Sequence, residues 1–222
     1  MEASYLEKKK TLEVYFDQTA LSAWEKLTSE LPVSWVREKV RKGRHETLET
    51  LLSALPNNLD GQRILDAGCG TGQLTFELAL RGANVIGVDI SEKLISIAEE
   101  RCPTNIVDKV SFYQGDMLDK QYGSFDYIIL MDSLIHYSET DMVKALNELS
   151  GRAHQKICFT IVPKSLLLSA KLMMGQCFPN ADKSPDVIPV KEKSLALNFS
   201  NLKKISSIRT GFYAADVMEI SK

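Results

Sequence analysis

Hydrophobic residues follow helical spacing in the first quarter of the chain. Over residues 5–55 they recur three or four positions apart, as Leu48 and Leu51 do, which predicts helices. Pro32 interrupts this run and predicts a break between at least two helices. Pro56, followed by the polar stretch NNLDG, ends the helical pattern. We therefore expect a helical arm at the N-terminus.

A different pattern continues from there to the end of the chain. Apolar β-type runs predict strands at residues 63–67, 84–89, 110–114, 125–131 and 156–162. Helical patterns between them predict helices near residues 71–81, 91–102 and 139–152. This alternation is typical of parallel βαβ units with helices on both faces of one sheet.

The last two runs, residues 203–209 and 212–220, have no helix between them and predict an antiparallel hairpin. The sequence thus predicts an α/β fold with a seven-stranded, mostly parallel sheet. We expect two units, the helical arm over residues 1–58 and the α/β domain over residues 59–222.

Composition narrows the classes of partner. The 222 residues are 44% hydrophobic and 25% charged, with a net charge of −2, which is ordinary for a globular protein and gives no reason to bind nucleic acid. The four cysteines are scattered without zinc-ligand spacing, so we expect reduced thiols and no metal site. The first ten residues lack the apolar core of a secretion signal, which predicts a cytoplasmic location.

A glycine-rich segment, ILDAGCGTG at residues 64–72, ends the first predicted strand and opens a helix. Glycines let the backbone approach a ligand closely, and the helix N-terminus supplies free amide donors. The spacing GxGxG differs from the GxGxxG of hydride-transfer enzymes, and Asp66 would repel a pyrophosphate but can accept a hydrogen bond from an amino group. These features favour S-adenosylmethionine, bound by Asp66, Gly68, Cys69 and Gly70; a tight turn without a ligand is the alternative.

Two more strand ends carry acidic residues at the edge where open α/β sheets bind ligands. Asp89 ends the second strand and Ile90 follows it; a carboxylate at this point can bind both ribose hydroxyls, although a helix cap is the alternative. Asp116 and Met117 follow the third strand, where they suit the amino group and the ring face of adenine; an ordinary turn is the alternative.

Four segments outside these motifs resemble one family. They are YFDQTALSAW at residues 15–24, VREKVRKGRHETLETLL at 36–52, DSLIHY at 132–137 and RTGFYAADVMEI at 209–220. All four closely resemble magnesium protoporphyrin IX O-methyltransferases of chlorophyll and bacteriochlorophyll synthesis. The resemblance covers nearly the whole chain and implies a Rossmann-like class I methyltransferase that esterifies one propionate of magnesium protoporphyrin IX, with a mobile N-terminal arm over the porphyrin pocket.

The resemblance also implies roles around the fourth strand. Met131 and Asp132 are expected to complete the cofactor site, and His136 of the LIHY motif is implicated in methyl transfer. A propionate has a pKa of about 4.3 and is already a nucleophile at neutral pH. We therefore expect His136 to orient it by a hydrogen bond; axial ligation of the magnesium and a purely structural histidine are the alternatives.

The arm is expected to supply most of the substrate contacts. Tyr15, Trp24 and Tyr137 lie in the family motifs and are predicted to contact the macrocycle. Arg41 and Arg44 are predicted to bind propionates, because a guanidinium pairs with a carboxylate through two hydrogen bonds. Core packing and a solvated helix face are the alternatives.

One branch of the family has a tyrosine after the arm tryptophan where this chain has Thr28, so a catalytic tyrosine is not expected there and the bacteriochlorophyll branch is favoured. The family also suggests transient contact with magnesium chelatase, and residues 165–178 are a candidate for peripheral membrane contact.

Two competing functions stay open, namely methylation of another small acid or quinone-like acceptor and cofactor binding without catalysis. A nucleic-acid methyltransferase is disfavoured, because it would need a basic groove and the net charge of this chain is −2.

Overall fold

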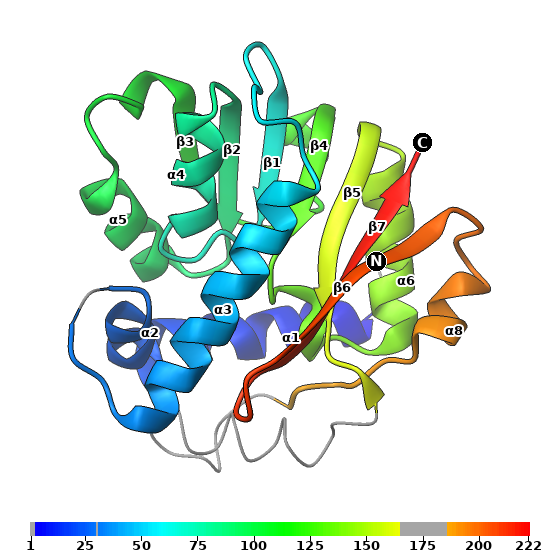
Figure 1. Cartoon of the computed structure of the whole chain (residues 1–222), viewed down its shortest axis with the longest axis horizontal. Helices are drawn as coiled ribbons and strands as arrows, with labels where there is room; N and C mark the ends of the chain where they lie inside the picture. The colour runs from blue at the N-terminus through cyan, green and yellow to red at the C-terminus, as the bar shows by residue number, and fades with distance from the viewer. Residues whose placement is uncertain (1–2, 30, 165–185) are drawn as a thin grey trace.

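The computed structural model describes residues 3–29, 31–164 and 186–222 (Figure 1). Its strands are β1 (Arg63–Ala67), β2 (Asn84–Asp89), β3 (Val110–Gln114), β4 (Phe125–Leu130), β5 (Ala153–Ile161), β6 (Leu202–Arg209) and β7 (Ala214–Ser221). Its α-helices are α1 (Ala3–Val14), α2 (Leu21–Leu27), α3 (Trp35–Ser53), α4 (Gln73–Leu80), α5 (Glu92–Arg101), α6 (Glu139–Ser150) and α8 (Glu192–Ala196). Short helical turns include η1 (Tyr15–Thr19) and η4 (Leu134–His136). All seven predicted strands are confirmed, whereas α8, only five residues long, was not predicted.

The strands form one sheet in the order β3-β2-β1-β4-β5-β7-β6. Strands β1 to β5 pair in parallel and β7 runs antiparallel to both of its neighbours, so the predicted mostly parallel sheet with a C-terminal hairpin is confirmed. The final strand lies inside the sheet and β6 forms the edge. This suits their sequences, because Val217 and Met218 of β7 are fully buried, while β6 carries exposed lysines that discourage pairing with another chain.

Alternate residues of the central strands face opposite sides of the sheet. Ile64 of β1 and Ile129 of β4 belong to a buried cluster that includes leucines of α3 and α4. Their neighbours Leu65 and Ile128 belong to a second cluster, which includes residues of α6. The sheet is therefore covered on both faces, as the runs of apolar residues predicted.

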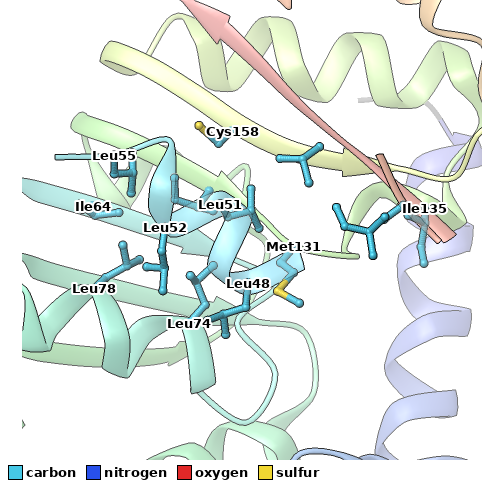
Figure 2. Close-up of a cluster of buried hydrophobic side chains, with 14 of the residues drawn as sticks. Leu48, Leu51, Leu52, Leu55, Ile64, Leu74, Leu78, Met131, Ile135 and Cys158 are labelled. Carbon is cyan, nitrogen blue, oxygen red and sulfur yellow. The ribbon is translucent and has the colours of Figure 1, made fainter. Parts of the chain in front are cut away.

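Helix α3 belongs to the core of the α/β domain, although the sequence places it in the arm. Leu51 and Leu52 are 0% and 1% exposed. Figure 2 shows them gathered with Leu74 and Leu78 of α4 and with Cys158 of β5. The predicted boundary at residue 58 thus does not separate two hydrophobic cores. That residues 1–58 act together as one lid stays a prediction.

Helix α1 lies across the carboxyl edge of the sheet (Figure 1). The Tyr5 hydroxyl donates to Asp116, which follows β3, at 2.9 Å. The Tyr5 ring stacks on Tyr137, which follows η4, with 4.9 Å between ring centroids. Ser4 adds a hydrogen bond to Asp141 of α6. Helix α1 is therefore anchored to residues that follow two strands, β3 and β4.

Three serines set the starts of the longer helices. The side chains of Ser34, Ser91 and Ser138 accept hydrogen bonds from backbone amides of the first turns of α3, α5 and α6. Such caps satisfy amide groups that have no partner within the helix. Because Ser91 lies two residues after Asp89, the α5 cap also fixes the chain beside the end of β2.

In the part of the chain that the structure describes, no helix has both the length and the apolar character needed to cross a membrane. The segment predicted to contact a membrane surface, residues 165–178, lies outside the described residues.

The place of α3 in the core yields a stability prediction. Leu51→Ala is expected to lower the free energy of unfolding by about 2–5 kcal/mol, because it removes a fully buried side chain and leaves a cavity. Leu80→Ala, at a residue that is 53% exposed, is expected to change it by about 0.5 kcal/mol or less. Urea unfolding followed by circular dichroism compares the two. Equal effects would show that α3 contributes little to the core.

Candidate functional site

A cavity lies at the carboxyl ends of β1, β2 and β4, where helices of the arm cover them. It encloses about 970 Å³ of space between atoms, part of it open to solvent. Most of the predicted cofactor residues line it: Asp66, Gly68, Cys69, Gly70, Asp89, Ile90, Met117, Met131 and Asp132. So do His136, Trp24, Arg44 and Tyr137. The structure therefore brings the predicted cofactor motifs and the predicted substrate residues to one cavity.

The glycine-rich loop wraps closely around Asp89, the last residue of β2. Gly68 has φ 84°, and a Cβ there would lie 2.4 Å from the Cβ of Ser133, so only glycine fits. The amide of Gly70 donates to Oδ2 of Asp89 at 2.9 Å, and the amide of Ser91 donates to Oδ1 at 2.9 Å. Asp89 is thereby held in one orientation at the cavity wall.

Two carboxyl groups are buried side by side in this wall. Burial raises the pKa of Asp66 to about 7; a hydrogen bond from Thr75 opposes the shift and the charge of Asp89 adds to it. Burial also raises the pKa of Asp89, against the hydrogen bonds from Ser91 and Gly70. Neither carboxyl forms an ion pair with a residue that the structure describes. Buried acids without a cation favour a ligand that brings positive charge and hydroxyl groups.

Polar atoms beside these acids point to the same ligand chemistry. The hydroxyl oxygens of Thr71 and Ser133 are buried and have no hydrogen-bond partner within the described ranges. Such atoms are rare in native proteins and often contact a ligand or water. S-adenosylmethionine carries an amino group, a charged sulfonium and ribose hydroxyls, so the acids and hydroxyls of this wall fit it.

His136 is buried, and its protonation state follows from its surroundings. Its Nδ1 lies 3.2 Å from the backbone oxygen of Asp186. Burial lowers its pKa to about 4, against this hydrogen bond, so the ring is neutral at pH 7. A carbonyl only accepts, so the proton of the neutral ring is on Nδ1 and Nε2 carries a lone pair.

This tautomer changes the role expected for His136. A carboxylate also only accepts hydrogen bonds, so the neutral Nε2 has no proton to donate to it. The predicted orienting hydrogen bond from His136 to an ionised propionate therefore does not fit the geometry. Nε2 instead suits a group that brings a proton or a metal ion.

Arg44 and Asp132 form an ion pair in the cavity wall. Nη1 of Arg44 lies 2.5 Å from Oδ2 of Asp132, and its guanidinium lies over the ring of Trp24, 4.7 Å from the centroid. Asp132 also accepts hydrogen bonds from Thr160 and from Tyr213. Asp132 was predicted to contact the cofactor, but the structure pairs both of its carboxylate oxygens with protein groups.

Three predicted site residues do not line the cavity. Arg41 donates to the backbone oxygens of Lys26 and Leu27 at the end of α2 and to that of Leu31 in the segment before α3. Asp116 binds Tyr5 and Lys9 of α1 in place of an adenine amino group. Tyr15 is buried, with the edge of its ring against Phe16. The substrate and cofactor contacts predicted for these three residues stay predictions.

Three polar side chains in or beside the cavity were not predicted from the sequence. Thr71 lies within the glycine-rich loop and Ser133 within the DSLIHY motif, so both stood beside residues that were predicted. Tyr213 lies within the family segment at residues 209–220, but nothing in the sequence indicated its partner, because its contact with Asp132 spans 81 residues. Among the described residues, no group of three or more histidines, cysteines, aspartates and glutamates is placed to hold a metal ion.

The sheet order, with one reversed strand beside β5, and the acidic cavity at its carboxyl edge define a class I methyltransferase. Residues 64–153 match a methyltransferase-domain model, and residues 130–222 match the model described as the magnesium-protoporphyrin IX methyltransferase C-terminus. The chain is 45% identical to the magnesium-protoporphyrin O-methyltransferase of Rhodobacter capsulatus, over 99% of each chain. It belongs to the magnesium-protoporphyrin O-methyltransferase family.

More distant relatives agree over the whole length. The magnesium-protoporphyrin O-methyltransferase of Synechocystis is 29% identical, with 96% of each chain covered. The crystal structure of magnesium protoporphyrin IX methyltransferase from Synechocystis with bound SAH superposes with a TM-score of 0.83 at 26% identity, over 97% of this chain and 99% of that chain. The likeness therefore includes the helical arm, which the general methyltransferase-domain match does not reach.

The buried acid in β1 yields a prediction for pH dependence. The unfolded chain releases the Asp66 proton near its ordinary value of 3.8 and the folded chain near 7, so folding binds a proton between these values. Stability contributed by this group is therefore lost as the pH rises from about 4 to about 7. Asp66→Asn is expected to raise the Tm of the cofactor-free protein at pH 8, with a smaller difference at pH 5.

The same substitution is expected to weaken S-adenosylmethionine binding by about tenfold or more, because a charge-assisted hydrogen bond is lost. Differential scanning fluorimetry and isothermal titration calorimetry measure the two effects. Asp108→Asn, at an exposed position, is the matched control and should change neither. A lower Tm for Asp66→Asn at pH 8 would contradict the prediction.

Proposed function

We propose that this chain transfers a methyl group from S-adenosylmethionine to a propionate carboxylate of magnesium protoporphyrin IX, giving the monomethyl ester. The observation that carries the proposal is one cavity lined both by the acidic strand-end loops and by Trp24, Arg44 and His136. Membership of the family, over the full length of the chain, supports the choice of substrate.

The acidic side of the cavity is proposed to hold the cofactor. S-adenosylmethionine supplies a methyl group on a positively charged sulfur. Asp66 accepts a hydrogen bond from its amino group, and Asp89, fixed by Gly70 and Ser91, accepts from the ribose hydroxyls. A contact of Asp116 with adenine stays a prediction, because its carboxylate is bound to α1 in this structure.

The arm side is proposed to hold the porphyrin. Phe16 and Trp24 present apolar ring surface, which suits a flat macrocycle, and Arg44 presents a guanidinium to a propionate. Catalysis then arises mainly from alignment of the reacting groups, an effect worth up to about 7–11 kcal/mol in well-oriented systems. The arm also excludes water by covering the carboxyl edge.

His136 is proposed to act as a proton acceptor for the reacting carboxyl. An apolar cavity raises the pKa of a carboxyl group, so part of the bound propionate carries a proton. Because burial lowers the pKa of His136 to about 4, Nε2 does not remove this proton before the reaction. The carbonyl oxygen of the carboxyl takes the methyl group, which makes the remaining hydroxyl strongly acidic, and the lone pair on Nε2 accepts its proton while Nδ1 keeps its bond to the carbonyl of Asp186.

The reaction itself is the first test of the proposal. Purified protein is incubated with S-adenosylmethionine and magnesium protoporphyrin IX, and the porphyrin is analysed by mass spectrometry for the gain of one methyl group. Metal-free protoporphyrin is the control. We expect the monoester with the magnesium compound. Cofactor binding without product would reject the proposal in favour of another acceptor or a non-catalytic role.

The role of His136 gives a separate prediction. His136→Phe keeps the ring packed near Phe16 but removes the acceptor, and is expected to lower kcat by about 10²-fold or more with cofactor affinity unchanged. His154→Phe, at an exposed position, is the control. Weaker cofactor binding in His136→Phe would show a structural role, and weaker binding of only the magnesium porphyrin would assign Nε2 to the metal ion.

Contact with magnesium chelatase, peripheral membrane contact and a cytoplasmic location stay predictions from the sequence. The assignment to the bacteriochlorophyll branch also stays a prediction. In the structure Thr28 caps the end of α2, where its hydroxyl donates to the backbone of Trp24 at 2.8 Å.

A further inference from the structure

Arg44 is the cation that the arm contributes to the cavity lining. A guanidinium has five N–H donors. Among the described residues, that of Arg44 donates one hydrogen bond, from Nη1 to Asp132. No other group of residues 3–29, 31–164 and 186–222 takes a hydrogen bond from the remaining donors, which can bind a carboxylate in the cavity, while Trp24 supports one face of the guanidinium. The side chain is 16% exposed, so it is held against the wall instead of extending into solvent.

Asp132 is committed to holding this arrangement. It has φ 57°, a left-handed conformation that is uncommon for residues other than glycine. Its amide donates to the hydroxyl of Thr160 at 2.7 Å, and that hydroxyl donates back to Oδ1 at 3.2 Å. Strained backbone of this kind persists only where the surroundings enforce it, and it is common at functional sites.

Tyr213 completes the arrangement from the C-terminal hairpin. Its hydroxyl lies 3.0 and 3.1 Å from the two oxygens of Asp132. Burial raises its pKa well above the ordinary value, so the hydroxyl keeps the proton that it donates. Its ring packs directly on α3, where a Cβ on Gly43 would lie 2.5 Å from Cδ1 of Tyr213.

The hairpin therefore contacts Asp132 and also the helix that carries Arg44. Next to Tyr213, the hydroxyl of Thr210 donates to the backbone of Lys39 in α3 at 2.9 Å, and the ring of Phe212 meets Trp35. Gly43 is adjacent to Arg44 in the same helix. Tyr213 thus fixes the helix that carries Arg44 and the carboxylate that Arg44 binds.

We propose that Tyr213 and Asp132 are positioning residues that hold the Arg44 guanidinium ready to bind a carboxylate of the porphyrin. An arginine side chain loses much rotamer freedom when it binds, and holding it beforehand removes that loss from the binding step. Asp132 also offsets the burial of the charge. This inference rests on the proposed function, and it specifies how that site recognises the acid groups of its substrate.

The test compares two ligands that differ only in their carboxylates. Magnesium protoporphyrin IX and its dimethyl ester are titrated into the protein, and porphyrin absorbance reports binding. The wild-type protein is expected to bind the diacid more tightly. Tyr213→Phe, which keeps the ring against Gly43, should weaken diacid binding by about five- to tenfold, as for one lost hydrogen bond, and leave diester binding unchanged. Its KM should rise with little change in kcat.

Arg44→Met keeps a long side chain against Trp24 and should remove the preference for the diacid. Adding Tyr213→Phe to Arg44→Met should then have no further effect, because the two residues act on one contact. Asp132→Asn keeps the shape of the side chain without the charge and should also weaken diacid binding. Tyr127→Phe removes a hydroxyl that donates to Gln155 in β5 and is the matched control, with both affinities unchanged.

Equal weakening of diacid and diester in Tyr213→Phe, or additive effects of Tyr213→Phe and Arg44→Met, would overturn the inference, because either result indicates a general loss of structure. An ester formed by wild-type protein and by Tyr213→Phe with the same KM would also overturn it. Absence of the ester with wild-type protein would instead overturn the proposed function.

Discussion

Two buried carboxyl groups without an ion-pair partner among the described residues determine which kind of ligand the cavity favours. Asp66 and Asp89 end neighbouring parallel strands, so the sheet itself places them at one edge. Burial disfavours their charged forms, and the protein offsets this with backbone amides and one hydroxyl instead of with a cation. The fold thereby holds negative charge ready for a positively charged ligand, at the expense of its own stability.

The helix that completes the cavity is held by the core. Leucines of α3 pack between α4 and the sheet, while Arg44, one turn earlier on the same helix, reaches the cavity wall. The position of the arginine is therefore determined by core packing on one side and by the C-terminal hairpin on the other. Helix α1 also packs into the core, because Tyr5 and Leu12 belong to the second buried cluster. It is attached in addition by hydrogen bonds, an ion pair and one ring stack near the carboxyl edge. Both ends of the arm are thus held by core packing, and α1 is also held by polar contacts with the loop after β3.

Much of the fold was predictable because its signals are local. The alternation of strands and helices, the reversed hairpin and the glycine-rich loop all follow from residues close together in sequence, and each is confirmed. The sequence left open which partner a side chain binds when several are within reach. Arg41 and Arg44 lie three residues apart in one basic run, yet Arg41 binds carbonyls at the end of α2 and Arg44 binds Asp132. Spacing alone does not separate these outcomes.

The sequence by itself determined the class of fold, the acids at the strand ends and the family, because strand ends in a parallel sheet meet at one edge whatever lies between them. Only the tertiary structure decided which of those acids face the cavity, which nitrogen of His136 carries the proton, and that Tyr213 supports Arg44. These depend on contacts between segments far apart in the chain, such as His136 with Asp186 and Asp132 with Tyr213. Which groups form a hydrogen bond depends on their distance in space. The sequence determines that distance only through the packing of the whole fold.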